Sequence, residues 1–133
     1  MMLNLWIDGG TYKNRICVSD GTKKEFFVEC QEKEHTNNQL EYLALSWAAK
    51  YYALNYQEGP PVIIWSDSQL IVRQVNGKYQ VKNHLLKPYY QQAMDDLEKA
   101  KIPPMCVQWL PRDQNYAGFY LEKLKDAEQK KRQ

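Results

Sequence analysis

Three stretches within the first thirty residues alternate between apolar and polar side chains, a pattern typical of β-strands with one buried face. Residues 3–8 predict a strand that ends where Gly9-Gly10 interrupts the alternation. Residues 15–20 and 24–30 predict two more strands, joined by a hairpin turn at Asp20-Gly21. We therefore expect the chain to open with a three-stranded antiparallel meander.

After residue 35 the spacing of apolar side chains changes to a helical period. We expect a helix that is capped by Thr36 or Asn37 and that ends near Asn55, ahead of a Gly-Pro-Pro segment. The apolar positions of this helix are Leu40, Leu43, Ala44, Trp47 and Tyr51.

The apolar run at residues 62–65 is typical of a strand that is buried on both faces of a parallel sheet. A short helix is expected to follow it, and a longer helix is expected over about residues 84–100, with Pro88 in its first turn. Residues 105–110 predict the last strand, and a final helix covers the C-terminal segment from Asn115 onward.

The predicted order is β-β-β-α-β-α-α-β-α, which indicates an α/β fold with a sheet of mixed strand direction. The length of 133 residues fits one domain, so we expect residues 1–133 to form a single domain. In such sheets functional residues gather beyond the C-terminal ends of the parallel strands.

Composition narrows the function only slightly. The formal net charge is +2, from 18 basic and 16 acidic residues, so any nucleic-acid site must be a local patch. Cys17, Cys30 and Cys106 are widely spaced and predict reduced thiols rather than a zinc site. No apolar run is long enough to span a bilayer and the N-terminal residues do not resemble a signal peptide, so we expect a cytoplasmic protein without a membrane partner.

Three carboxylates are candidate functional residues. Asp8 and Asp67 each follow a predicted strand, and they would meet at one edge if the two strands are parallel neighbours. Glu41 lies on the predicted inner stripe of the first long helix, where an acid is costly without a partner. Alone, Asp8 fits a turn, Asp67 a helix cap and Glu41 a solvated helix face. Together the three predict a site for Mg²⁺ or Mn²⁺, because clustered carboxylates repel one another unless a cation neutralises them.

Several segments together resemble type 1 ribonuclease H over nearly the whole chain. The matching segments are IDGG at 7–10, TNNQLEYLAL at 36–45, WSDSQLIVRQVNG at 65–77, VKNHLLKPYY at 81–90 and WLPRDQN at 109–115. The resemblance implies a ribonuclease H-like fold, with a five-stranded mixed sheet flanked by helices. It also implies two-metal-ion cleavage of the RNA strand of RNA–DNA hybrids, by a protein that is a monomer in this family.

The resemblance also implies residue roles. Asp8, Glu41 and Asp67 match three of the four metal-binding acids of the family. Arg112 lies where relatives carry a His or Arg that helps the leaving phosphate. An exposed arginine considered alone is more often a surface residue without a catalytic role. The residues that match substrate-contacting positions of the family are Gly9, Thr36, Asn37, Asn38, Gln39 and Gln69. A plain helix cap at Thr36-Asn37 and a solvated side chain at Gln69 remain the structural alternatives.

The fourth acid of the family is missing from its usual place. It normally appears four residues after an asparagine, and alignment on Asn115 puts Phe119 there, while a shift of one residue puts Gly118 there. Three explanations remain open. Asp113 or Glu122 completes the site, or three acids and the substrate phosphates suffice, or the protein is a weak or inactive hybrid binder. If three acids suffice, we expect Mn²⁺ to support the site better than Mg²⁺.

Two substrate-binding regions also depart from the family. The loop at residues 11–15 is short and basic, which leaves Asn14 and Arg15 as candidates for reaching phosphate. The basic segment of some members is reduced here to Lys78 and Lys82, which either grip phosphate modestly or are ordinary solvated lysines.

Other function classes fit less well. A hybrid-binding module without activity gains nothing from acids beside phosphates. A junction resolvase on the same fold does not account for the TNNQ and SDSQ segments, and a dinucleotide-binding protein would need a GxGxxG loop after the first strand.

Overall fold

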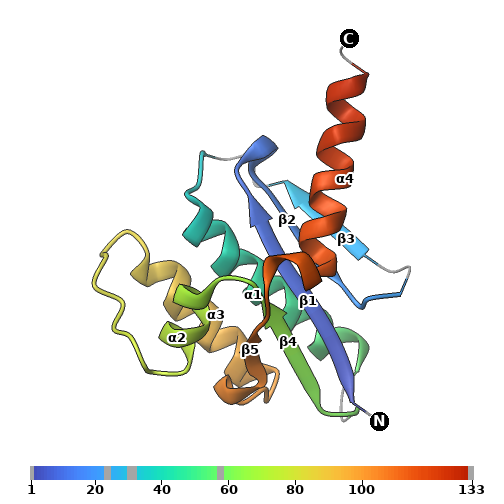
Figure 1. The fold of residues 1–133 in the computed structure, drawn as a ribbon. Helices are drawn as coiled ribbons and strands as arrows, with labels where there is room; N and C mark the ends of the chain where they lie inside the picture. The colour runs from blue at the N-terminus through green and yellow to red at the C-terminus, as the bar shows by residue number, and fades with distance from the viewer. Residues whose placement is uncertain (1, 23–24, 30–32, 57–58, 132–133) are drawn as a thin grey trace.

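The computed structural model describes residues 2–22, 25–29, 33–56 and 59–131. These residues form a five-stranded sheet of order β3-β2-β1-β4-β5 with four α-helices (Figure 1). The elements are β1 (Leu3–Gly10), β2 (Arg15–Ser19), β3 (Glu25–Glu29), α1 (Asn37–Asn55), β4 (Val62–Ser66), α2 (Gln69–Val75), α3 (Lys87–Lys99), β5 (Val107–Trp109) and α4 (Tyr116–Lys130). The predicted order of elements and the mixed sheet are confirmed.

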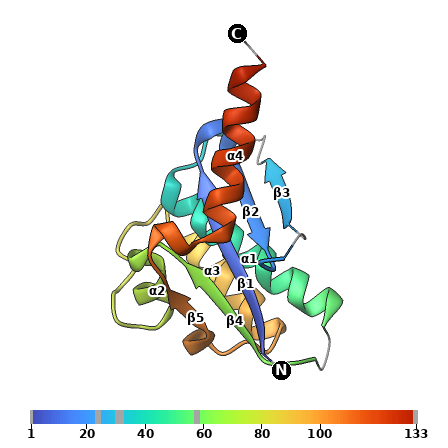
Figure 2. The same ribbon diagram turned by 45° about the vertical axis from the view of Figure 1, so that its right-hand side comes forward.

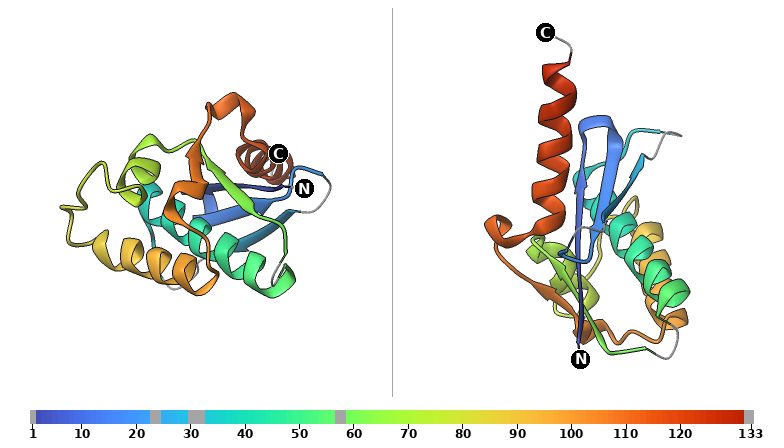
Figure 3. Two further views of the ribbon diagram at one scale, coloured as in Figure 1. Left: turned by 90° about the horizontal axis from the view of Figure 1, so that it is seen from below. Right: turned by 90° about the vertical axis from the view of Figure 1, so that its right-hand side faces the viewer.

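The sheet lies between two helical layers. Helices α1 and α3 cover one face, and α4 lies on the other (Figure 3). Helix α4 runs along β1 and β2, and its C-terminal part projects beyond the sheet (Figure 2). The three-stranded meander is antiparallel, whereas β4 is parallel to both β1 and β5. The first and fourth strands are therefore parallel neighbours, which is the condition set for Asp8 and Asp67 to meet.

The main core lies between the sheet and α1. Leu5 and Ile7 from β1 and Leu40 and Leu45 from α1 are fully buried there. Burying such a side chain stabilises the fold by roughly 1.5–3 kcal/mol. Among the described residues, no helix combines the length and the apolar character that crossing a bilayer requires.

The prediction that Gly9-Gly10 ends the first strand is wrong. Both glycines continue β1, and they pair with Ile16 and Arg15 of β2. A Cβ atom on Gly9 would lie 2.7 Å from the carbonyl carbon of Leu40, so Gly9 lets α1 approach the strand closely. The helix–sheet contact, rather than a turn, accounts for this glycine.

Two other predicted elements have different bounds in the structure, and part of a third is not described. Helix α3 begins at Lys87 instead of about residue 84, because Pro88 fits the first helical turn. Strand β5 is shorter than predicted, since residues 104–106, which begin with the second of two prolines, form a 3-10 helix. Residues 24 and 30 of the third predicted strand lie outside the described residues.

The fourth strand is not buried on both faces as predicted. Burial alternates along β4, and Ile63 and Trp65 are only half-buried. Helix α4 lies over β1 and β2 and leaves this part of the sheet uncovered. Trp6 and Trp65 instead line a pocket of about 760 Å³.

Candidate active site

Two parallel strands bring Asp8 and Asp67 together. Trp6 of β1 pairs with Trp65 of β4, and each aspartate lies two residues further along its own strand direction. Both carboxylates therefore reach the same edge of the sheet and point to the same side of it. This confirms the predicted meeting of the two carboxylates.

Glu41 completes the cluster from the inner face of α1. One carboxylate oxygen from each of Asp8, Glu41 and Asp67 lies within 4.8 Å of the others. The backbone N–H of Gly9 donates a hydrogen bond of 3.1 Å to Oε1 of Glu41. Oε2 of Glu41 is buried and has no hydrogen-bond partner in the described part of the chain. The solvated helix face considered for Glu41 is therefore not what the structure has.

Burial and repulsion between neighbouring carboxylates raise the pKa of two acids of the cluster, Glu41 and Asp8. Burial, together with the charges of Asp8 and Asp67, raises the pKa of Glu41 well above its usual range. Burial also raises the pKa of Asp8, where Arg112 opposes the shift and Asp67 adds to it. Such a cluster is poised to release protons when it binds a cation.

The carboxylates fit a hard divalent ion. Three carboxylates converge in the cluster, and Oε2 of Glu41 lacks a protein donor although it is buried. Oxygen ligands of this kind select Mg²⁺ or Mn²⁺. Asp8, Glu41 and Asp67 are the described residues that would hold such an ion.

Arg112 makes direct ion pairs with the cluster. Its Nη1 lies 2.9 Å from Oδ1 of Asp8 and 2.9 Å from Oδ2 of Asp67. Although partial burial opposes it, the two carboxylates raise the pKa of Arg112 above its usual value. The side chain remains half exposed, at 56%, so it covers the cluster from the solvent side.

Asn115 is a site residue that sequence reasoning used only to align a motif. Its Oδ1 accepts from the backbone N–H of Ala117 and so caps α4. Its Nδ2 donates to the carbonyl oxygen of Ile7 and to Oδ2 of Asp67, both at 2.9 Å. Asn115 thus ties the start of α4 to β1 and orients the Asp67 carboxylate. Its place just before a predicted helix was the available signal for the cap.

At the expected place of the fourth acid, Gly118 faces the cluster. A Cβ atom on Gly118 would lie 3.3 Å from Oδ2 of Asp8, whereas the Phe119 side chain is 61% exposed. Glu122 lines the same cleft but is not part of the carboxylate cluster, and Asp113 lines the aromatic pocket on the β4 side. The structure therefore brings neither of these candidate substitutes into the cluster.

A cleft of about 610 Å³ opens over the cluster. Among the predicted substrate residues, Gly9, Arg15, Asn37 and Asn38 line it, and both asparagines are exposed. Two lining residues that were not predicted, Tyr12 and Lys125, extend the cleft along α4, and Nζ of Lys125 lies 5.7 Å from the Tyr12 ring centre.

Thr36 and Gln39 form the capping box of α1. The Thr36 side chain accepts from the Gln39 N–H, and the Gln39 side chain accepts from the Thr36 N–H. Thr36 is therefore the cap that was predicted as one of two candidates, and both residues stand exposed or half exposed beside the cleft.

Three other predicted substrate residues lie apart from the cleft lining. Nδ2 of Asn14 donates to the carbonyl oxygen of Lys33, so Asn14 holds the loop before α1. Gln69 is exposed and lines a separate pocket beside β5, and Lys82 is exposed in the segment before α3. Arg15, by contrast, borders the cleft, but it is buried and its guanidinium is held in ion pairs to Glu29 and Glu128, so it is not free to reach phosphate.

Strand order, parallel register and the acidic edge together define a ribonuclease H-like fold. The structure is similar to that of LC11-RNase H1, isolated from compost, in complex with an RNA/DNA hybrid. The two chains are 26% identical, with a TM-score of 0.71, over 86% of this chain and 88% of that one. RNase H1 of the archaeon Halobacterium salinarum has the same fold, with 22% identity and a TM-score of 0.70 over 95% of this chain and 99% of that one.

Sequence comparison gives the family. The family model described as reverse transcriptase-like matches residues 16–123, so the chain belongs to this family. A curated relative is EbsB of Enterococcus faecalis, whose name assigns it provisionally to the hydrolases. Its alignment with this chain is 28% identical over 130 residues and covers 90% of this chain and 90% of EbsB.

Proposed function

We propose that this protein is a metal-dependent endonuclease that hydrolyses the RNA strand of RNA–DNA hybrids. The observation that carries the proposal is the cluster of Asp8, Glu41 and Asp67, with carboxylate oxygens within 4.8 Å of one another in an open cleft. The similarity to LC11-RNase H1, which was solved with a hybrid bound, supports the choice of substrate. We expect the protein to act as a monomer, built as one domain.

The three acids would hold the divalent ion, and a bound ion supplies charge neutralisation and activation of a water molecule for attack on phosphorus. Asn115 keeps the Asp67 carboxylate oriented through its 2.9 Å hydrogen bond. Arg112 stands over the cluster with its guanidinium half exposed, where it meets the negative charge of a scissile phosphate.

Recognition of the hybrid falls to the start of α1. Asn37 and Asn38 are exposed at the cleft, next to the capping box of Thr36 and Gln39. Amide side chains at this position suit phosphate oxygens and the ribose 2′-hydroxyl, which is the group that distinguishes RNA from DNA. Lys125 lies further along the cleft and adds positive charge for the backbone of the nucleic acid.

A second candidate is a hybrid-binding module without activity. The observation that favours it is the combination of Gly118 at the edge of the cluster and Arg112 on two of its acids. Against it stands the energetic cost of three buried or partly buried carboxylates, which a pure binder does not need beside phosphates.

The test is cleavage of an end-labelled RNA–DNA hybrid in Mg²⁺ and, separately, in Mn²⁺. We expect internal cuts confined to the RNA strand, faster in Mn²⁺, and a loss of at least about 100-fold in Asp67→Asn. The matched control is Asp113→Asn, which changes an aspartate of the 3-10 helix Arg112–Gln114 that lies outside the cluster and should retain activity.

Single-stranded RNA and duplex DNA serve as substrate controls and should stay intact. Hybrid binding without cleavage in either metal would instead establish the binding module. Equal loss of activity in Asp113→Asn would contradict the assignment of three acids.

A further inference from the structure

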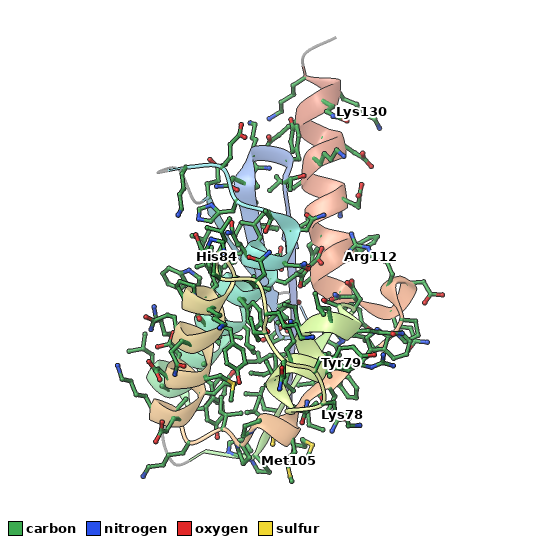
Figure 4. The ribbon with its side chains drawn as sticks, turned by 90° about the vertical axis from the view of Figure 1, so that its left-hand side faces the viewer. Lys78, Tyr79, His84, Met105, Arg112 and Lys130 are labelled. Atoms are coloured by element: carbon green, nitrogen blue, oxygen red, sulfur yellow. The ribbon has the colours of Figure 1, made fainter. Side chains whose placement is uncertain are left out.

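The cluster already contains a cation of its own. Arg112 pairs with Asp8 and Asp67 at 2.9 Å, and no other ion pair to the three acids is found in the described part of the chain. Figure 4 shows Arg112 near the start of α4, far from Lys130 at the other end of that helix. When all three carboxylates are ionised, this guanidinium leaves the site with a formal charge of −2, which one divalent ion neutralises.

The backbone fixes Arg112 in this place. The residue begins a 3-10 helix, Arg112–Gln114, and its carbonyl oxygen accepts from the Asn115 N–H at 3.1 Å. Asn115 in turn caps α4 and shares Oδ2 of Asp67 with the guanidinium. The arginine is therefore anchored to an asparagine that itself hydrogen-bonds a carboxylate of the cluster.

Gly118 provides the room for the guanidinium. A Cβ atom at position 118 would lie 3.1 Å from Nη1 and 3.2 Å from Cζ of Arg112. A side chain that carried a carboxylate there would compete with the arginine for the same space beside Asp8. The large side chain of Arg112 therefore fits the space that is left because Gly118 has no side chain.

We propose that Arg112 is the resident cation of this site. Its guanidinium, which lies beside Gly118, replaces both a fourth carboxylate and a second divalent ion. The site then takes one divalent ion, held by Asp8, Glu41 and Asp67. This inference rests on the proposed function only in assigning a metal ion to the three acids.

The consequence is an opposite effect of Arg112 on metal binding and on turnover. A fixed positive charge beside the ligand oxygens repels an incoming cation. Loss of that charge should strengthen metal binding. It should also slow cleavage, because the positive charge over the scissile phosphate is lost.

The experiment is a Mn²⁺ titration of the full chain without nucleic acid, followed by the electron paramagnetic resonance signal of free Mn²⁺. We expect the wild type to bind one ion and Arg112→Gln to bind Mn²⁺ at least about tenfold more tightly, which corresponds to about 1.4 kcal/mol. The control is Arg73→Gln, which removes an exposed arginine that hydrogen-bonds Tyr79 away from the cluster and should leave Mn²⁺ affinity unchanged.

A double-mutant cycle with Gly118→Asp tests the shared space. The added carboxylate should strengthen Mn²⁺ binding only slightly while Arg112 is present, because the two side chains pair. In the Arg112→Gln background it should strengthen binding clearly and allow a second ion to bind. Such a dependence of one substitution on the other is the expected signature of neighbouring groups.

Two results would overturn the proposal: unchanged Mn²⁺ affinity in Arg112→Gln, or an equal gain from Gly118→Asp in both backgrounds. Arg112→Lys, which keeps the charge but loses the planar fork, should bind Mn²⁺ with nearly wild-type affinity. Arg112→Met, which also removes the charge, replaces the glutamine variant if that variant fails to fold. Because these titrations contain no hybrid, they remain decisive even if the protein cleaves nothing.

Discussion

Replacing Glu41 with glutamine should abolish cleavage and yet stabilise the metal-free protein. Glu41 is only 6% exposed, and its Oε2 has no hydrogen-bond donor in the described part of the chain. A glutamine keeps the acceptor for the Gly9 N–H and places an amide N–H₂ group beside the Asp8 carboxylate. The substitution therefore removes a repelled, buried charge without opening a cavity.

The size of the effect follows from the spacing of the acids. Two unit charges 4.8 Å apart repel by about 3.5 kcal/mol at an effective dielectric constant of about 20. Arg112 offsets part of the cluster's charge, and protonation of Glu41 relieves some of the rest. We therefore expect a gain of about 1–3 kcal/mol at pH 8, which raises the melting temperature by roughly 3–10 °C.

The pH dependence has a definite sign. Because the pKa of Glu41 is raised in the folded protein, the folded state binds more protons than the unfolded state between the two pKa values. The stability of the wild type without metal should therefore fall as pH rises from the usual glutamate pKa through the raised one. The advantage of Glu41→Gln should vanish in acid, where Glu41 is neutral in both states, and should grow toward alkaline pH.

Urea or thermal unfolding in EDTA from pH 4 to pH 9, repeated in saturating Mg²⁺, measures this. In Mg²⁺ the order should reverse, because a bound ion stabilises only the protein that holds it. Glu122→Gln is the control, since this exposed carboxylate lines the same cleft outside the cluster and should change stability by less than about 0.5 kcal/mol. A glutamine variant less stable than the wild type in EDTA at pH 8 would refute the reasoning.

Two further substitutions test the packing of α1 against the site. Gly9→Ala should destabilise the fold by about 1–3 kcal/mol in urea unfolding, because the added Cβ atom would lie 2.7 Å from two carbon atoms of Leu40; unchanged stability would show that the helix shifts freely. Thr36→Ala should cost about 1 kcal/mol in the same assay, through loss of the capping box, whereas Thr36→Ser should restore most of it. Equal losses in both Thr36 variants would contradict a capping role.

The sequence was sufficient to predict the framework of the site because that framework depends on local patterns. The two strands that end near Asp8 and Asp67 were recognisable from their apolar positions, whereas their parallel pairing was only a condition that the structure meets. The cap at Thr36 followed from residue type and position at the start of a helical period. These features require no knowledge of distant contacts.

The remaining features depend on contacts between distant segments. Gly9-Gly10 is a turn signal locally, but pairing with β2 and the close approach of α1 make it a strand. Taken alone, Arg112 is typical of a surface residue, and only the family resemblance marked it as catalytic; its ion pairs join positions 104 and 45 residues away in the sequence. Which of Gly118 and Phe119 faces the cluster depends on the rotation of α4 over the sheet, which the helical period does not determine.

The structure also weakens the purely structural interpretation of the acids. Asp67 was a candidate helix cap, but Ser68 caps α2 through its bond to the Ile71 N–H. Asp8 was a candidate turn residue, but its strand continues beyond it to Gly10.

Glu41 was a candidate for a solvated face, but it is buried. None of the three acids therefore has the structural role considered for it, as a turn residue, a helix cap or a solvated side chain. Burial and repulsion also raise the pKa values of Asp8 and Glu41. Buried acids that cost stability and have no structural task are best explained by a function that needs their charge. The unfolding measurement in EDTA tests whether the charge of these acids lowers the stability of the fold. The Mn²⁺ titration tests whether the same charge binds a metal ion.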